Sequence, residues 1–147
     1  MKVSRASVYA FYGLGYLAGQ PPDRWVPLSE IGKKNSVPEK HLAKIFQSLV
    51  KAGVLRSERG SKGGFALKPP ARRLPLLRIM EIIDGPTTSP GCLLHQSPCD
   101  DELACPLHRV VRTAEDGMLK SLRKTTVGDI AHTGRSSSTP PRPHPDT

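Results

Sequence analysis

The segment from Pro27 to Leu67 constrains the fold of this chain more than any other part of the sequence. It reads PLSEIGKKNSVPEKHLAKIFQSLVKAGVLRSERGSKGGFAL, and its apolar residues recur at three- and four-residue spacing as far as Gly53. Helical faces repeat every 3.6 residues, so this spacing predicts a short helix, a turn and a longer helix. The glycine-rich remainder predicts two short strands joined as a hairpin. We therefore expect a helix-turn-helix followed directly by a hairpin.

The turn between the two helices carries start and stop signals. We expect the first helix over Leu28–Lys34 and a tight turn at Asn35. Ser36 and Glu39 have the S-x-x-E form of a capping box, in which the serine hydroxyl caps the start of the second helix. The second helix should bury one face and expose the other. The expected buried residues are Leu42, Ile45, Phe46, Leu49 and Val50, and the polar face shows Lys40, His41, Lys44, Gln47 and Ser48.

The net charge of the chain is concentrated in this same segment. Residues Gly32 to Arg73 hold eleven Lys and Arg and two acidic residues, an excess of nine that equals the net charge of the whole chain. Such a basic segment favours a polyanionic partner, because neutralised phosphates release counterions. A module that binds only proteins would leave this charge unexplained. The candidate DNA-contacting residues are Ser36, Lys40, His41 and Lys44 on the second helix or at its start, and Arg59 and Lys62 at the hairpin tip.

Three further helices are expected around the central segment. Ser4 can cap a helix that runs to about Ala18, a second helix spans about 75–84, and a long helix spans about 106–124. The long helix has an apolar face with little chain left to cover it. We expect that face to pack on a second subunit, with packing against the first helix of the same chain as the alternative. Its residues are Leu107, Val110, Val111, Ala114, Met118, Leu119 and Leu122.

The expected fold class is mainly α with a small β-hairpin wing, that is, a winged helix-turn-helix plus a long C-terminal dimerisation helix. Residues 1–85 form the winged domain, 86–131 the cysteine loop and dimerisation helix, and 132–147 a tail whose Pro/Ser-rich composition predicts disorder. The stretch TTVGDI, just before the tail, predicts a short capped turn. No apolar run approaches the ~20 residues of a membrane span. The start, MKVSRASVYAFYGLGYLAGQ, could be a signal peptide, but its apolar residues recur at helical spacing and no clear cleavage site follows, so we expect a cytoplasmic protein.

All three cysteines lie in one stretch, GCLLHQSPCDDELACPLH, with the spacing C-x6-C-x5-C-x2-H from Cys92 through Cys99 and Cys105 to His108. An odd number of cysteines fits a reducing compartment, where clustered thiols serve metal or redox chemistry. Thiolates suit iron–sulfur clusters and zinc, and a thiol switch without metal is a third reading. Cys105 and His108 could also form a nucleophile and base, but no cleft or oxyanion donor accompanies them, so we do not expect an enzyme.

These motifs together resemble the iron–sulfur regulators typified by IscR and NsrR, within the Rrf family of winged helix-turn-helix transcriptional regulators. The resemblance covers about residues 1–131. It rests on the three spaced cysteines and on the stretches MKVSRASVYA, SVPEKHLAKIFQSLVKAGVL, RGSKGGFAL, IMEIIDG and TTVGDIA.

The resemblance implies a homodimeric regulator, most often a repressor, that binds a partly palindromic operator in double-stranded DNA. It implies that Cys92, Cys99 and Cys105 ligate an iron–sulfur cluster, with [2Fe-2S] favoured over [4Fe-4S] and zinc less expected. Some members take a carboxylate ligand from the first helix, but Ser4 to Tyr12 offers no acid or histidine here. His108, ahead of His95, is therefore the expected fourth ligand. The signal would be redox state, nitric oxide or iron–sulfur status.

Overall fold

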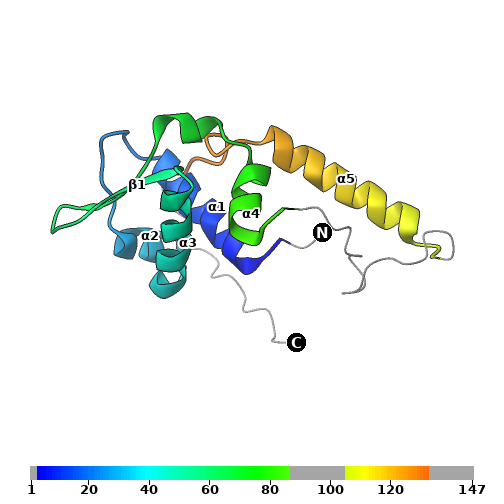
Figure 1. The fold of residues 1–147 in the computed structure, drawn as a ribbon, viewed down its shortest axis with the longest axis horizontal. Helices are drawn as coiled ribbons and strands as arrows, with labels where there is room; N and C mark the ends of the chain where they lie inside the picture. The colour runs from blue at the N-terminus through cyan, green and yellow to red at the C-terminus, as the bar shows by residue number, and fades with distance from the viewer. Residues whose placement is uncertain (1–2, 87–104, 133–147) are drawn as a thin grey trace.

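Five α-helices, one 3-10 helix and a two-stranded hairpin make up the computed structural model, which describes residues 3–86 and 105–132. This is the mainly α architecture with a hairpin that the sequence predicts. Figure 1 shows α2, α3 and the hairpin at one end of the molecule and α5 at the other. The elements are α1 (Arg5–Ala18), α2 (Leu28–Asn35), α3 (Glu39–Lys51), β1 (Leu55–Glu58), β2 (Gly64–Leu67), η1 (Pro69–Arg73), α4 (Leu76–Asp84) and α5 (His108–Lys124).

Helix α1 lies at the centre of the winged domain. It begins as expected at Ser4, whose hydroxyl accepts a 3.0 Å hydrogen bond from the Ser7 amide and so satisfies one of the unpaired donors of the first turn. Helices α2, α3 and α4 all pack against it. Tyr16 is buried, and its hydroxyl donates a 2.6 Å hydrogen bond to Glu30 of α2. Burial and this bond raise the pKa of Tyr16, and the bond ties α2 to α1.

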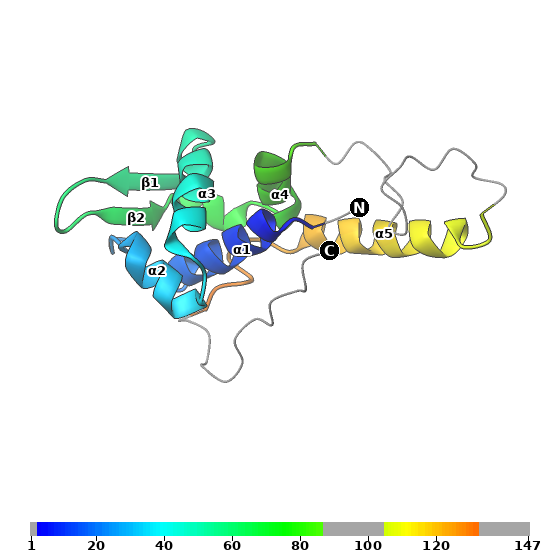
Figure 2. The ribbon, with the colours of Figure 1, turned by 90° about the horizontal axis from the view of Figure 1, so that it is seen from below.

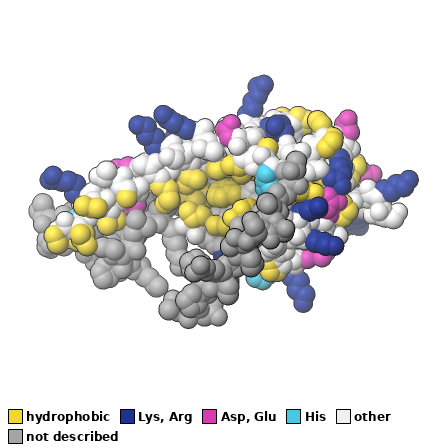
Figure 3. Space-filling view, turned by 180° about the vertical axis from the view of Figure 1, so that it is seen from behind, with side chains coloured by type: hydrophobic (Ala, Val, Ile, Leu, Met, Phe, Trp, Pro, Cys, Tyr) yellow, Lys and Arg dark blue, Asp and Glu magenta, His cyan; other side chains and the backbone are white. Residues whose placement is uncertain are grey.

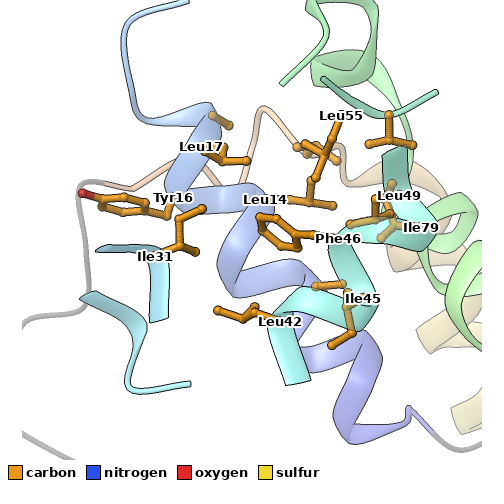
Figure 4. Close-up of a cluster of buried hydrophobic side chains, with 14 of the residues drawn as sticks. Leu14, Tyr16, Leu17, Ile31, Leu42, Ile45, Phe46, Leu49, Leu55 and Ile79 are labelled. Atoms are coloured by element: carbon orange, nitrogen blue, oxygen red, sulfur yellow. The ribbon is translucent and has the colours of Figure 1, made fainter. Parts of the chain in front are cut away.

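The hydrophobic core lies between α1, α2, α3 and the hairpin. Phe46 of α3 is fully buried at its centre and meets the ring of Phe65 in β2 edge-on, with 5.1 Å between ring centroids. Figure 4 shows the side chains of α1 and α3 converging on this point. Burial of this apolar face, rather than helix propensity, holds α3 in place. The surrounding buried residues include Leu14, Leu17, Ile31, Leu42, Ile45, Leu49, Leu55 and Ile79.

The hairpin is short and antiparallel, with Leu55 opposite Leu67 and Glu58 opposite Gly64. A third stretch of chain joins it, because Val26 exchanges two backbone hydrogen bonds of 2.9 and 3.0 Å with Phe65. The hairpin is thereby anchored to the segment between α1 and α2. Its free end then extends away from the body in Figure 2.

The chain after α5 returns to the body of the molecule. Thr126 and Asp129 form the short capped turn that the sequence predicts: the amide and hydroxyl of Thr126 donate hydrogen bonds of 2.8 and 2.7 Å to the Asp129 carboxylate. These bonds lower the pKa of Asp129. Val127 is fully buried beside α4 and η1. In the two described ranges, no helix is both long enough and apolar enough to cross a bilayer.

Candidate nucleic-acid interface and cysteine site

Helix α3 separates its apolar and basic residues between two faces. Leu42, Ile45, Phe46 and Leu49 are buried against α1 and the hairpin side of the core. Val50, expected to be buried, is only partly buried and packs against the edge of this core. The exposed positions include the predicted contact residues Lys40, His41 and Lys44. A helix anchored along one face in this way offers the opposite face to a partner as a fixed surface. We call α3 the reader helix from here on.

The start of the reader helix differs from the prediction. Ser36 does not cap α3: it ends α2 in the left-handed conformation (φ 54°, ψ 42°), and α3 begins after Pro38 with no side-chain cap. The left-handed residue turns the chain so that Val37 enters the core and its amide donates a 3.0 Å hydrogen bond to Gly32. Burial of Val37 therefore overrides the local capping pattern. Ser36 remains exposed at the turn.

His41 on the reader helix is in contact with α1. Its ring lies 6.0 Å from the ring of Tyr9, at an interplanar angle of 56°. His41 is nevertheless exposed, so its position is fixed on one side while the other side stays accessible. Lys40 and Lys44 are one helical turn apart and are also exposed, so all three predicted side chains lie at the surface.

The tip of the hairpin carries the two remaining basic candidates. Arg59 and Lys62 are both exposed there. Gly60 has a φ of 111°, which other residues rarely adopt, and its carbonyl accepts a 3.0 Å hydrogen bond from Gly63. The tight turn that results projects both basic side chains away from the core. We call residues 55–67 the wing.

An aromatic contact at the base of the wing steadies it further. The guanidinium of Arg56 in β1 lies over the ring of Trp25, 5.1 Å from the centroid. Figure 3 shows Lys and Arg side chains at both ends of the molecule and along one edge, so the position of the excess charge follows from the sequence. The residues that carry the excess of nine positive charges, 32–73, run from the end of α2 through the reader helix and the wing to η1.

Half of the predicted ligand set lies within the described residues. Cys105 is half-buried three residues before α5, and His108 is the first residue of that helix. The His108 amide donates a 3.1 Å hydrogen bond to the Cys105 carbonyl, so the two side chains arise from one turn of chain. A thiol and an imidazole so close together fit the donor chemistry of an iron–sulfur cluster or of zinc. Cys92, His95 and Cys99 lie outside the described residues.

Two residues of structural importance were missed by sequence reasoning. Asn35, interpreted as a turn residue, is fully buried at the end of α2. Its side-chain oxygen lies 2.9 Å from Nε2 of His132, the first residue of the predicted tail. The 97-residue separation between them leaves no local signal of this contact. The only hint in the sequence is a polar residue at a position that helical spacing places inward.

Known proteins with similar sequences are transcriptional regulators. A family model described as "Rrf2: Iron-dependent Transcriptional regulator" matches residues 3–133. An HTH-type transcriptional regulator of Aquifex aeolicus is 30% identical over 124 residues, which cover 83% of this chain and 85% of that protein. The HTH-type regulator BadM of Rhodopseudomonas palustris is 29% identical over 131 residues, or 88% of this chain and 81% of BadM.

Solved structures share the fold. The oxidized form of Staphylococcus aureus CymR has a TM-score of 0.69 at 23% identity, covering 92% of this chain and 100% of that chain. CymR of B. subtilis, described as its global cysteine regulator, has a TM-score of 0.65 at 24% identity, covering 89% and 96%. IscR of T. potens has a TM-score of 0.64 at 22% identity, covering 88% and 85%. These structures share a winged helix-turn-helix fold with this chain.

Proposed function

The chain belongs to the Rrf2 family of transcriptional regulators, and we propose that it is a homodimeric repressor whose affinity for DNA is set by an iron–sulfur cluster. Members of this family regulate transcription by binding DNA and are not enzymes. Cys105 and His108 are accordingly assigned to metal binding rather than to catalysis. The proposal places the protein in the cytoplasm, together with its operator.

The location of the positive charge supports the DNA-binding assignment most strongly. The reader helix presents Lys40, His41 and Lys44 at the surface, and the adjacent wing presents Arg59 and Lys62. We assign the reader helix to the major groove, where only its side chains can select sequence, with Ser36 at its entry. We assign the wing to the phosphates or the minor groove, where it contributes affinity for any sequence.

The cysteine segment supplies the effector site in this proposal. Cys92, Cys99 and Cys105 would provide thiolates and His108 an imidazole to a cluster, with [2Fe-2S] favoured. When bound, the cluster would supply a redox-sensitive centre whose gain, loss or oxidation changes DNA affinity. Coupling between two such sites is typically ~1–3 kcal/mol, or about 5- to 150-fold in affinity. The family description as iron-dependent and the fold shared with T. potens IscR favour this assignment.

A thiol sensor without metal is the second candidate function. Two of the structures with the same fold are CymR proteins, one of them in an oxidized form and one described as a cysteine regulator. Cys105 is only half-buried and forms no disulfide with another described residue, so an oxidant could reach its thiol. A structural zinc site with the same four ligands is the remaining alternative.

Dimerisation through α5 completes the proposal. Leu107 and Val110 are 49% and 65% exposed, which is unusual for large apolar side chains. Figure 3 shows hydrophobic side chains gathered along the projecting part of α5. A second copy packed on this face would remove them from water and hold two reader helices at a fixed spacing. Two-fold symmetry of that kind matches a partly palindromic operator.

The test begins with anaerobic purification and analysis of iron, sulfide and zinc. Duplexes are then selected from a random-sequence library with the purified protein and with protein stripped of metal. We expect stoichiometric iron and sulfide, and a selected duplex whose affinity falls steeply with salt and differs between the two forms. Zinc without sulfide would support the structural zinc site, and affinity that follows thiol oxidation without metal would support the thiol sensor. Failure of both forms to bind any duplex at low ionic strength would overturn the proposal.

A further inference from the structure

The segment after α5 is held on the winged domain by its backbone. We call residues 125–132 the C-terminal strap. It begins directly after α5 and runs alongside residues 72–76, which lead into α4. Three backbone hydrogen bonds of 2.8 to 3.0 Å fasten it there: from Leu76 to the carbonyl of Thr125, from Val127 to the carbonyl of Leu74, and from Gly128 to the carbonyl of Arg72.

The end of the strap lies directly on α1. The His132 amide donates a 3.0 Å hydrogen bond to the Gly15 carbonyl. A Cβ atom at Gly15 would stand 2.6 Å from the Ile130 carbonyl oxygen and 2.8 Å from Nδ1 of His132, closer than atoms can approach. Glycine at this position therefore lets the strap touch the helix backbone. The His132 ring also lies against the ring of Tyr16, with 6.1 Å between centroids.

This placement directs the His132 ring at the turn before the reader helix. Nε2 lies 2.9 Å from the side-chain oxygen of Asn35, and Nδ1 lies 3.2 Å from the Ile130 carbonyl. The Asn35 amide nitrogen donates a 2.8 Å hydrogen bond to the Ile31 carbonyl, which fixes the orientation of the amide group. Its oxygen must then face His132, and Nε2 is the donor of the bond. Ser36, the left-handed residue of the turn, follows Asn35 directly.

We propose that His132 is a positioning residue for the reader helix: its hydrogen bond to Asn35 fixes the turn between α2 and α3 and thereby sets the affinity for specific DNA. Asn35 is fully buried, so no water replaces His132 as a partner while the strap is docked. Base contacts tolerate little misorientation of the reader helix, whereas phosphate contacts tolerate more. The inference rests on the proposed DNA-binding function. It adds His132, which lies outside the proposed set of DNA-contacting residues.

The experiment compares two replacements that differ in whether they keep a hydrogen-bond donor. His132→Phe keeps a ring but removes the donor, whereas His132→Gln keeps a donor that can reach Asn35. Both are measured against the duplex selected by the wild-type protein and against an unrelated duplex of mixed sequence. We expect His132→Phe to weaken binding to the selected duplex by about tenfold. This is the loss expected if a misoriented reader helix loses about one of its base contacts. Binding to the unrelated duplex should change less than about twofold, and His132→Gln should restore most of the affinity.

A measurement without DNA separates this inference from the proposed function. The Val37 amide, which donates to Gly32 inside the turn, should exchange with deuterium several-fold faster in His132→Phe than in the wild type. A wild-type protein that binds no duplex would overturn the proposed function, and the exchange rate would still show whether His132 holds the turn. Unchanged exchange, or an equal loss of affinity for both duplexes, would overturn the role of His132. Wild-type affinity for the selected duplex in His132→Phe would overturn it as well.

Discussion

The Ser7 hydroxyl donates a 2.8 Å hydrogen bond to the Asp84 carboxylate and so joins the first turn of α1 to the last residue of α4. Ser4 donates to the other oxygen of the same carboxylate at 2.5 Å. A negative charge beside the start of α1 is also favourable for the helix dipole. Asp84 ends the helix that leads toward the cysteine segment. The point at which the chain leaves α4 is thus fixed against the winged domain.

Replacing Asp84 with Ala should therefore destabilise the fold. The buried Ser7 hydroxyl would lose its acceptor, and we expect the free energy of unfolding to fall by about 1–2 kcal/mol in urea titrations. Glu81→Ala on the same helix is the control, because the Glu81 carboxylate pairs with the exposed Arg78 at 3.3 Å. That change should cost less than about 0.5 kcal/mol. Equal losses in the two variants would mean that the link to α1 contributes nothing.

The wing can be tested through the salt dependence of DNA binding. Arg59→Ala should weaken binding to every duplex, because the proposed partner of this side chain is a phosphate. The slope of log affinity against log salt concentration should become shallower by about 0.9, the value expected for one phosphate. Lys120→Ala on α5 removes the same charge from an exposed site outside the wing. It should leave the slope unchanged, and a slope that responds equally to both changes would show that only net charge matters.

The elements of this fold were predictable because their signals are local. The spacing of apolar residues predicted the reader helix, and the fully buried Phe46 and Leu42 confirm the predicted core face. Ser4 caps α1 as predicted, since capping depends on only three neighbouring residues. The candidate contact residues on the reader helix are exposed because they lie on the face opposite the buried apolar residues. Their role in DNA binding stays a prediction.

The errors arose where a distant contact competes with a local pattern. Ser36 has the spacing of a capping residue, yet burial of Val37 draws the turn into a left-handed conformation instead. Asn35 was placed in the turn because asparagine favours turns. Its partner His132 is 97 positions away in the sequence, at the start of the expected tail. Sequence periodicity predicts only contacts between neighbouring residues. A contact between residues this far apart is found only in the folded structure.

Cys105 provides the test of the effector site. Cys105→Ala removes one thiolate of the proposed set, so visible absorbance of the anaerobically purified protein should disappear. Circular dichroism should be unchanged, because the half-buried thiol contributes little to the core. The comparison variant is His108→Ala, which should retain absorbance with an altered spectrum and a faster decay in air. Full absorbance in Cys105→Ala would contradict its assignment as a ligand.

The exposed face of α5 predicts the oligomeric state. Val110→Asp would place a charge in the proposed interface, and the dimer dissociation constant should rise at least about tenfold in sedimentation experiments. Lys120→Asp also adds an acid to α5, but at a position outside the apolar face. It should leave the dimer intact. A Val110→Asp protein that sediments as the wild type does would exclude this face as the interface.

Two glycine-to-alanine changes test whether the C-terminal strap rests on α1 in solution. Gly117 lies in α5 with open space around the position that a methyl group would take, so Gly117→Ala should stabilise the protein by about 1 kcal/mol through helix propensity alone. Gly15→Ala brings the same gain to α1, but its methyl group would meet the Ile130 carbonyl oxygen at 2.6 Å. The strap backbone would have to move, which costs about 1–3 kcal/mol and more than offsets the gain. Urea titrations of the two variants should therefore shift in opposite directions. If Gly15→Ala stabilises as Gly117→Ala does, the strap is not docked on α1, and His132 has no fixed place from which to reach Asn35.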